Sequence, residues 1–514
     1  VDYNRNDVLD YHKMEITHED FINKDLKHFS NSDNIRSIPN LLDGFKVSQR
    51  KVFYCTVKKN IKNEIRVAQL AGYISETGNY HHGEASLQGT IVNMAQDYIG
   101  SNNINILEPN GQFGSRILGG KDSAEPRYIH TKINPLINYI FRKEDSKILD
   151  YKDNDGIIVE PNYYIPIIPM LLVNGSEGIG TGWSTFIPSF NPSDIINNLR
   201  ILINNNKKNT NNVLEELKPY YNNFTGKIIK YNENSYLSYG KYKRINKSQI
   251  EITELPIKTW IQNYKEFLES ITLDNSIKDT KKRYLRNYTS HCSDTEIKFI
   301  LTFAQDTLET LLNTKDSEQN ITYFEKIFKL TSKISVSNMV LYYNDDKLYK
   351  YTNVCDILKD YYKIRIGCYN KRKENQINNL KDELKILNVK IRFIMEFINE
   401  TIKIIKIKRN QVIKQLYDKE YHNLEEDNIK KDSRCKTNGF NYLIKLPIDV
   451  LTEEKLEELK KDRDDKDKYL QLLINTSIYD IYLKELNELE SGYNTILKNE
   501  NIESGKKINL FKKK

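Results

Sequence analysis

The feature that most constrains the fold of this 514-residue chain is a heptad repeat in its last third. Apolar residues alternate at spacings of three and four, with Lys, Glu and Asn between them, which is typical of a long coiled-coil helix. Two such series flank a small globular stretch. We therefore expect two helices that pair antiparallel as an arm with a head; two unrelated surface helices are the alternative. The series are Ile377, Leu380, Leu384, Leu387, Ile391, Ile394 and Ile398, then Tyr482, Leu486, Leu489, Tyr493 and Ile496.

Length and composition limit the class of protein. A chain this long predicts two to four domains, and 39% apolar with 29% charged residues suits a soluble globular protein. No run is long enough to cross a bilayer, so we expect no membrane role. The first residue is Val1 and no secretory signal is visible, so we expect a processed or excised piece.

Cysteine usage and net charge narrow the class further. The five cysteines are scattered and form no CxxC pair, which argues against disulfides and zinc ribbons and favours a reducing compartment. The net charge of +8 permits a nucleic-acid partner without requiring one.

The remaining chain reads as a mixed α/β, multidomain protein. Residues 30 to 140 are rich in turn signals and short helical patterns, which predicts a compact helical domain with a wing-like loop. The run "YYIPIIPMLLV" predicts a buried segment before a tight loop. Alternating stretches between residues 220 and 350 predict a β-rich α+β domain.

No metal site is predicted. In "DYKDNDG" the register of a calcium loop places Tyr151 and Asn162 where carboxylates belong. In "YHHGE", His81, His82 and Glu84 lack further ligands at a zinc-binding spacing.

The loop "NGSEGIGTGWS" fits neither nucleotide-binding pattern, GxGxxG before a helix or a GK[ST] end. Its glycines let the backbone come close to another group, with Ile179 between them. On residue types alone, a tight turn with a buried Ile179 is favoured.

The pair Arg127–Tyr128 lies in "GGKDSAEPRYIHTKINP", a segment short of bulky apolar residues. A free tyrosine hydroxyl has a pKa near 10 and is a poor nucleophile at neutral pH. The pair is either ordinary surface chemistry, or an arginine that helps a tyrosine attack a phosphate. Gln112 and Arg116 lie nearby, and "DGFKVSQRKVFY" carries cations as a phosphate-contacting helix does. Together these signals indicate a phosphodiester ligand.

Five longer motifs closely resemble, in order and spacing, the DNA breakage-reunion region of eukaryotic-type type IIA DNA topoisomerases. The resemblance covers about residues 19 to 200, with the last of the five motifs further on at residues 252–260, and weaker similarity continues through "FNYLIKLPIDVLTEEK" to about residue 490. The motifs are "SIPNLLDGFKVSQRKV", "VAQLAGYISETGNYHHGEASL", "NILEPNGQFGSRILGGKDSAEPRYIHT", "YYIPIIPMLLVNGSEGIGTGWS" and "ITELPIKTW".

The resemblance implies roles for residues. Tyr128 would attack a DNA phosphodiester and become linked to the 5′ end, Arg127 would stabilise charge on the phosphate oxygens, and His82 would hydrogen-bond the phosphate. Ile179 would insert between base pairs and bend the duplex, in place of the buried position expected above. The expected DNA-contacting residues are Arg36, Lys46, Arg50, Tyr80, Gln112, Ile179 and Trp260. One departure is that Val47 and Ser48 replace the family's usual Pro-Gly.

The resemblance also implies the domain order. The expected parts are a linker (1–29), a winged-helix domain with the tyrosine (30–155), an α+β tower or shoulder domain (156–352), a coiled-coil helix (353–410), a small helical C-gate head that forms the dimer (411–465), a returning coiled-coil helix (466–500) and a basic tail (501–514).

Partners and cofactors follow from the resemblance as well. It implies double-stranded DNA, a homodimer formed through the head, and a nuclear location. Mg²⁺ would be held by a metal-binding domain, and ATP by an ATPase domain, both outside this chain but in the same parent protein. A non-catalytic DNA-bending architectural module and a coiled-coil scaffold are the alternatives, and the scaffold does not account for Arg127–Tyr128.

Overall fold

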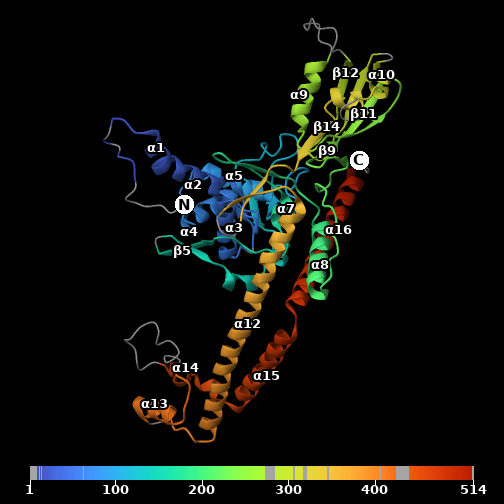
Figure 1. Ribbon diagram of the computed structural model, residues 1–514. Helices are drawn as coiled ribbons and strands as arrows, with labels where there is room; N and C mark the ends of the chain where they lie inside the picture. Colours follow the sequence, from blue (N-terminus) through green and yellow to red (C-terminus); the bar gives the residue numbers. More distant parts are fainter. Residues whose placement is uncertain are drawn as a thin grey trace. The chain divides into compact units, whose positions relative to one another are not determined.

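The computed structural model in Figure 1 confirms the expected mixed α/β, multidomain class. It describes residues 8–10, 12, 14–61, 63–154, 156–272, 284–304, 307–316, 321–343, 347–404, 407–423 and 439–511. The chain forms two compact units, which are residues 1–366 with 482–514 (unit 1) and residues 367–481 (unit 2). The last three residues of the expected basic tail lie outside the described residues, and the helix before them ends at Phe511.

Unit 1 begins with helices packed around a small antiparallel sheet of order β1-β3-β2. Helix α4 forms because Val67, Leu70, Ala71 and Ile74 repeat at helical spacing and bury one face. The elements are α1 (His18–Phe21), the π-helix η1 (Ile22–Leu26), α2 (Lys27–Ser37), α3 (Val47–Lys59), β1 (Ile65–Arg66), α4 (Val67–Thr77), α5 (Glu84–Ala95), β2 (Leu107–Asn110) and β3 (His130–Ile133).

Two hairpins and a buried helix follow. The apolar run at residues 163 to 173 lies in the interior, as expected, and α7 at its end is buried from Met170 to Val173. The hairpin β6–β7 leaves this core and carries Ile179 at the end of β6. The elements are α6 (Ile137–Ile140), the 3₁₀-helix η2 (Lys143–Ile148), β4 (Tyr151–Asn154), β5 (Ile157–Pro161), α7 (Met170–Asn174), β6 (Ser176–Ile179), β7 (Ser184–Ile187) and α8 (Pro192–Lys208).

The β-rich stretch contains a four-stranded antiparallel sheet (β10-β11-β13-β12), a three-stranded one (β14-β9-β8) and the hairpin β15–β16. A core that includes Ile250, Leu268, Phe299 and Phe324 packs helices on the first sheet. The elements are β8 (Lys227–Asn232), β9 (Ser235–Tyr239), β10 (Lys241–Arg244), β11 (Gln249–Glu254), α9 (Ile261–Ile271), β12 (Leu285–Ser290), β13 (Phe299–Phe303), α10 (Thr307–Asn313), α11 (Tyr323–Ile327), β14 (Thr331–Ser335), β15 (Met339–Tyr342) and β16 (Leu348–Tyr351).

Both heptad series lie in helices, but the expected returning helix at 466–500 is two helices. The chain breaks at Thr476, whose backbone is extended, and Ser477 begins the next helix by accepting a hydrogen bond from Tyr479 N. The elements are α12 (Val354–Ile398), α13 (Arg409–Asp418), α14 (Asn441–Ile444), the 3₁₀-helix η4 (Ile448–Leu451), α15 (Glu453–Asn475) and α16 (Ile478–Phe511).

Within unit 2, the antiparallel partner of the first series is α15. Lys373 Nζ of α12 donates to Ile474 O at 3.0 Å, and Glu383 pairs with Lys466 at 3.1 Å, so residue numbers rise on one helix as they fall on the other. Leu387, Ile391 and Ile394 share a core with Leu456 and with α13 and α14. Part of the expected head, residues 424–438, lies outside the described residues.

Within unit 1, the second series packs on the core. Tyr482 is fully buried, donates its hydroxyl hydrogen to Ile167 O at 2.7 Å and stacks on Tyr362 of α12. Glu488 binds Arg142 at 2.6 Å. The heptad period therefore predicted the buried face of α16, while its partners come from residues far away in the sequence.

Replacing Ile394 with Ala tests the core of unit 2. Ile394 is fully buried, and we expect the variant to lose about 2–5 kcal/mol of local stability because a cavity replaces its side chain. Hydrogen exchange of α12 and α15 amides would measure the loss. Ile474→Ala is the matched control, since Ile474 is 41% exposed and its truncation should cost no more than about 0.5 kcal/mol. Equal exchange in the two variants would contradict the assigned core.

Candidate functional site

Tyr128 lies at the end of a turn directly before β3, with 67% of its side chain exposed. Its backbone N–H donates to Glu125 O at 2.9 Å, which closes the turn. An exposed phenol on a closed turn is accessible to a ligand while its backbone is held in place.

The same turn is attached to the start of α4. Val67 N donates to Ile129 O at 3.0 Å, and Ala68 N donates to Pro126 O at 3.1 Å. The first amides of a helix lack partners within the helix, so these carbonyls satisfy two of them. Ile129 is buried beside the exposed tyrosine and adds an apolar attachment. The turn is therefore fixed on both sides of Tyr128.

Arg127 is exposed, and its guanidinium carbon lies 5.0 Å from the centre of the Tyr128 ring. Within the described part of the chain it forms no ion pair, so its donors can bind an anionic ligand. The sequence-predicted pair is thus brought together at the surface.

His82 is exposed in the loop before α5, and its ring lies 5.3 Å from that of Tyr80, edge to face. Tyr80 itself is only 8% exposed, so its main visible role is to pack against the exposed His82 ring. The expected DNA contact of Tyr80 stays a prediction.

Ile179 is 81% exposed, which overturns the expectation of a buried side chain drawn from residue types alone. The flanking glycines explain the difference. A Cβ on Gly178 would lie 2.1 Å from Ser37 O, and one on Gly180 would lie 2.2 Å from Asn34 Oδ1. Because side chains alternate along a strand, the glycine face lies on α2 and Ile179 points the opposite way.

Two predicted cations form hydrogen bonds with other parts of the protein. Lys46 Nζ donates to Glu177 O at 2.7 Å, and burial lowers the pKa of Lys46, which the Glu177 charge partly opposes. Arg50 is buried and binds Asp43 through two hydrogen bonds of 2.7 and 3.0 Å. Burial disfavours the Arg50 charge, but Asp43 more than offsets this and the pKa of Arg50 is raised. Arg50 is thus held in the interior, whereas Lys46 is partly exposed, and the expected DNA contacts of both residues stay predictions.

The N-terminal end of α3 forms despite the replaced Pro-Gly pair. The helix begins at Val47, and Gln49 Oε1 accepts a hydrogen bond from Lys46 N at 2.9 Å. Arg36, one of the predicted contacts, lies exposed in the last turn of α2.

Gln112 is exposed, while Trp260 is half-buried. The indole lies against Gly119, where a Cβ would be 2.3 Å from it and where φ is +63°, and edge-on to Tyr98 at 5.8 Å. The glycine run before Arg127–Tyr128 therefore makes room for Trp260. Arg116 joins the same two segments, since it donates to Leu255 O at 2.8 Å in the interior.

Among the described residues, no group of three or more His, Cys, Asp or Glu side chains could hold a metal ion. His81, His82 and Glu84 form no such group. None of the described helices is long and apolar enough to span a membrane.

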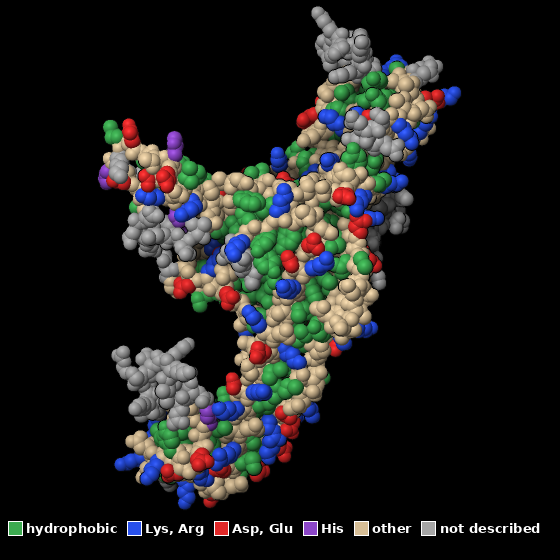
Figure 2. Space-filling view, in the orientation of Figure 1, with side chains coloured by type: hydrophobic (Ala, Val, Ile, Leu, Met, Phe, Trp, Pro, Cys, Tyr) green, Lys and Arg blue, Asp and Glu red, His purple; other side chains and the backbone are tan. Residues whose placement is uncertain are grey.

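The surface charge is mixed on the face drawn in Figure 2. There, Lys and Arg side chains are interspersed with Asp and Glu rather than gathered in one large patch. A ligand that carries many negative charges binds best where cations form a local cluster.

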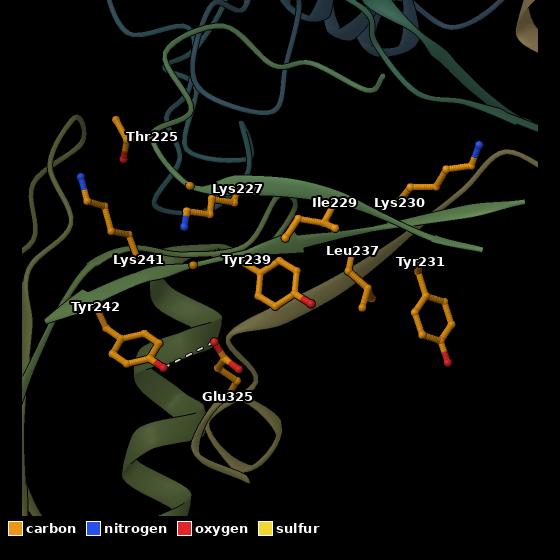
Figure 3. A pocket seen from close by; sticks show the side chains of 12 residues that line it. Thr225, Lys227, Ile229, Lys230, Tyr231, Leu237, Tyr239, Lys241, Tyr242 and Glu325 are labelled. Carbon is orange, nitrogen blue, oxygen red and sulfur yellow. Dashed lines mark hydrogen bonds between the residues drawn. The ribbon is translucent and has the colours of Figure 1, made fainter. Parts of the chain in front are cut away.

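One such cluster is a groove of about 900 Å³ where the chain passes from β9 to β10 at Gly240 (Figure 3). Lys230 pairs with Glu216 at 2.6 Å, whereas Lys227 and Lys241 have no ion pair with any described residue. The side chains that give it its basic and aromatic character are Lys227, Lys230, Lys241, Tyr231, Tyr239 and Tyr242. We call this the β8–β10 groove; no signal in the sequence singled it out.

The chain is similar to known proteins over most of its length. The family of DNA gyrase/topoisomerase IV A-subunits matches residues 36–487. DNA topoisomerase 2 of Plasmodium falciparum is 39% identical over 507 residues, covering 94% of this chain and 35% of that protein. DNA topoisomerase 2 of Saccharomyces cerevisiae is 39% identical over 532 residues, covering 96% of this chain and 36% of that protein. DNA topoisomerase 2-alpha of Gallus gallus is 41% identical over 488 residues, covering 92% of this chain and 30% of that protein.

The chain thus spans about a third of the length of these curated relatives. A crystal structure of the Plasmodium falciparum topoisomerase II DNA-binding, cleavage and re-ligation domain matches with a TM-score of 0.83 and 38% identity. The match covers 96% of this chain and 67% of that one.

Gly178→Ala tests the close approach of β6 to α2. The new Cβ would meet the backbone oxygen of Ser37, which cannot rotate away, so we expect a loss of about 1–3 kcal/mol in stability. Gly72→Ala is the control: it lies in α4 with open space around it, and should gain about 0.5–1 kcal/mol. Thermal unfolding measures both, and a Gly178 variant as stable as the Gly72 variant would contradict this packing.

Proposed function

The chain belongs to the family of DNA gyrase/topoisomerase IV A-subunits, and we propose on that basis that it is the DNA gate of a type II DNA topoisomerase. It would bind and bend duplex DNA, make a transient double-strand break through a 5′-phosphotyrosine link, let a second duplex pass and reseal the break. The observation that carries this proposal is the exposed Tyr128 on its anchored turn, with Arg127 beside it, which forms no ion pair with any residue that the structure describes.

The chemical step is a transesterification. The Tyr128 hydroxyl oxygen attacks the phosphorus, a new O–P bond forms, and the P–O3′ bond breaks. The phenolic proton leaves for water or a nearby base, and the released 3′ oxygen takes up a proton. One phosphodiester replaces another, so resealing is the same step in reverse and needs no new energy source.

Arg127 and His82 would act on the phosphate. A guanidinium presents a fixed fork of donors that matches phosphate oxygens, and such donors lower the barrier where charge develops. Arg127 is free to do this because no described residue pairs with it. His82 is exposed and held by Tyr80, so it would donate a hydrogen bond to a phosphate oxygen.

Bending would come from Ile179. An apolar side chain that enters between base pairs unstacks the step and kinks the duplex. The 81% exposure of Ile179 at the end of β6 suits that role. Arg36 and Gln112, both exposed, would contact the DNA, whereas Lys46, Arg50, Tyr80 and Trp260 would support the surfaces that do.

The rest of the active site would lie outside this chain. The described residues offer no metal-binding group, so we propose that Mg²⁺ is held by another domain of the parent protein and ATP by a further one. Two tyrosines are needed to cut two strands, which implies a homodimer formed through the head of unit 2. Crosslinking of cysteines placed at residues 440 to 455 would test that dimer. The eukaryotic relatives suggest a nuclear location.

Tyr128→Phe tests the nucleophile. Full-length protein, duplex DNA and Mg²⁺ are mixed, denatured and probed for protein-linked 5′ ends. We expect the parent to form the adduct and Tyr128→Phe to form none, because the attacking oxygen is gone. Tyr139→Phe, at a tyrosine that is 40% exposed, should form the adduct normally. If the parent forms no adduct but still bends DNA, the chain is a non-catalytic architectural module instead.

The β8–β10 groove would contact flanking duplex. Log affinity falls as log salt rises, and each phosphate contact contributes about 0.9 to the steepness of that fall. We expect the double variant Lys227→Gln with Lys241→Gln to make the fall shallower by about 2. Titrations at several salt concentrations measure the slope. Lys371→Gln with Lys461→Gln, at exposed sites of unit 2, is the control and should leave it unchanged. An unchanged slope in the groove variant would remove this surface from the DNA path.

A further inference from the structure

The tip of the β6–β7 hairpin is held by two consecutive residues of α2. Thr181 Oγ1 donates to Asp33 Oδ2 at 2.7 Å, and Asn34 Nδ2 donates to Thr181 O at 3.1 Å. Thr181 lies in the turn between the strands, which Gly180 N closes by donating to Trp183 O at 2.8 Å. Side chain and backbone of the same turn residue are therefore both fixed to α2.

The tip of the hairpin packs in close contact with α2. Asn34 is 6% exposed, and its Oδ1 lies where a Cβ of Gly180 would be, at 2.2 Å. No described residue gives that oxygen a hydrogen bond. A shift of the tip would break the two hydrogen bonds of Thr181 without offering new ones.

The base of the hairpin is held separately. Lys46 Nζ donates to Glu177 O at 2.7 Å, and Lys258 pairs with the Glu177 carboxylate. On the other strand, Asn338 Nδ2 donates to Ser184 O at 3.1 Å. The base of the hairpin is thus also held by residues outside α2, whereas the hydrogen bonds of Asp33 and Asn34 hold its tip.

We propose that Asp33 and Asn34 are positioning residues for Ile179, an inference that rests on the proposed bending role of that side chain. DNA resists being kinked, and the opposing force falls on the inserted residue. If the tip could hinge, the tip would move and the duplex would stay unbent. The contacts to Asp33 and Asn34 would transfer the force to α2, the helix that also carries the exposed Arg36 in its last turn.

Thr181→Val and Asp33→Ala test this inference, since each removes the hydrogen bond between the Thr181 hydroxyl and the Asp33 carboxylate. Full-length protein with Mg²⁺ would be measured for bending of an end-labelled duplex by energy transfer, and for affinity by anisotropy at the same salt. We expect the bent-to-unbent ratio of the bound duplex to fall about fivefold, the effect of one hydrogen bond, while the overall affinity falls by no more than that factor. Asp33→Asn retains an acceptor and should restore bending. Asn31→Ala, on the same helix, is the control and should bend DNA normally.

Combination with Ile179→Ala separates positioning from general damage. In that background Thr181→Val should have no further effect on bending, because the side chain it positions is gone. Two outcomes would overturn the positioning role and leave the proposed function intact. One is an additive loss of bending in the double variant. The other is that Thr181→Val bends DNA like the parent while Ile179→Ala does not. If Ile179→Ala bends DNA like the parent, the wedge and its positioning both fall, while adduct formation at Tyr128 still reports on cleavage.

Discussion

The site depends on one fully buried carboxylate, that of Asp43. A buried charge is stable only if donors surround it. Asp43 accepts two hydrogen bonds from Arg50 at 2.7 and 3.0 Å, one from Phe45 N at 2.9 Å and one from Tyr164 N at 2.9 Å. These bonds tie the start of α3 to the segment before α7, and Gly44, at φ +70°, allows the turn to lie directly on Leu171. The chain beyond this turn is thereby placed so that Lys46 reaches Glu177 at the base of the Ile179 hairpin.

This arrangement explains which site residues the sequence could predict. Arg127, Tyr128 and Ile179 were identified by motif, and they lie exposed because local backbone closes around them: a turn bonded to α4 in one case, alternation between glycines in the other. Lys46 and Arg50 carry the charge of DNA-binding residues, but their acceptors decide their placement. The partner of Lys46 is 131 residues away, a distance that no local pattern reveals.

The same limit applies to the fold. Heptad spacing identified the buried faces of α12 and α16, since the period of an α-helix determines which side chains share a face. It does not say what covers that face. In unit 2 the cover is α15 and the head core, and in unit 1 it is the segment around Ile167 with Tyr362. The break at Thr476, which separates α15 from α16, has no Pro or Gly to announce it.

Tyr128 and Ile179 share a construction principle. Each is among the more exposed large side chains of the described residues, and each lies next to backbone that is hydrogen-bonded to a helix. For Tyr128 that helix is α4, and for Ile179 it is α2. Exposure alone would give a mobile group, and in the proposed roles of nucleophile and wedge a mobile side chain would lose the advantage of fixed orientation. Bending a duplex smoothly through a binding site costs of order 1–6 kcal/mol, which is comparable to a few hydrogen bonds. If Ile179 bends DNA as proposed, the tip contacts of the hairpin are of the size needed to decide whether the protein or the DNA deforms.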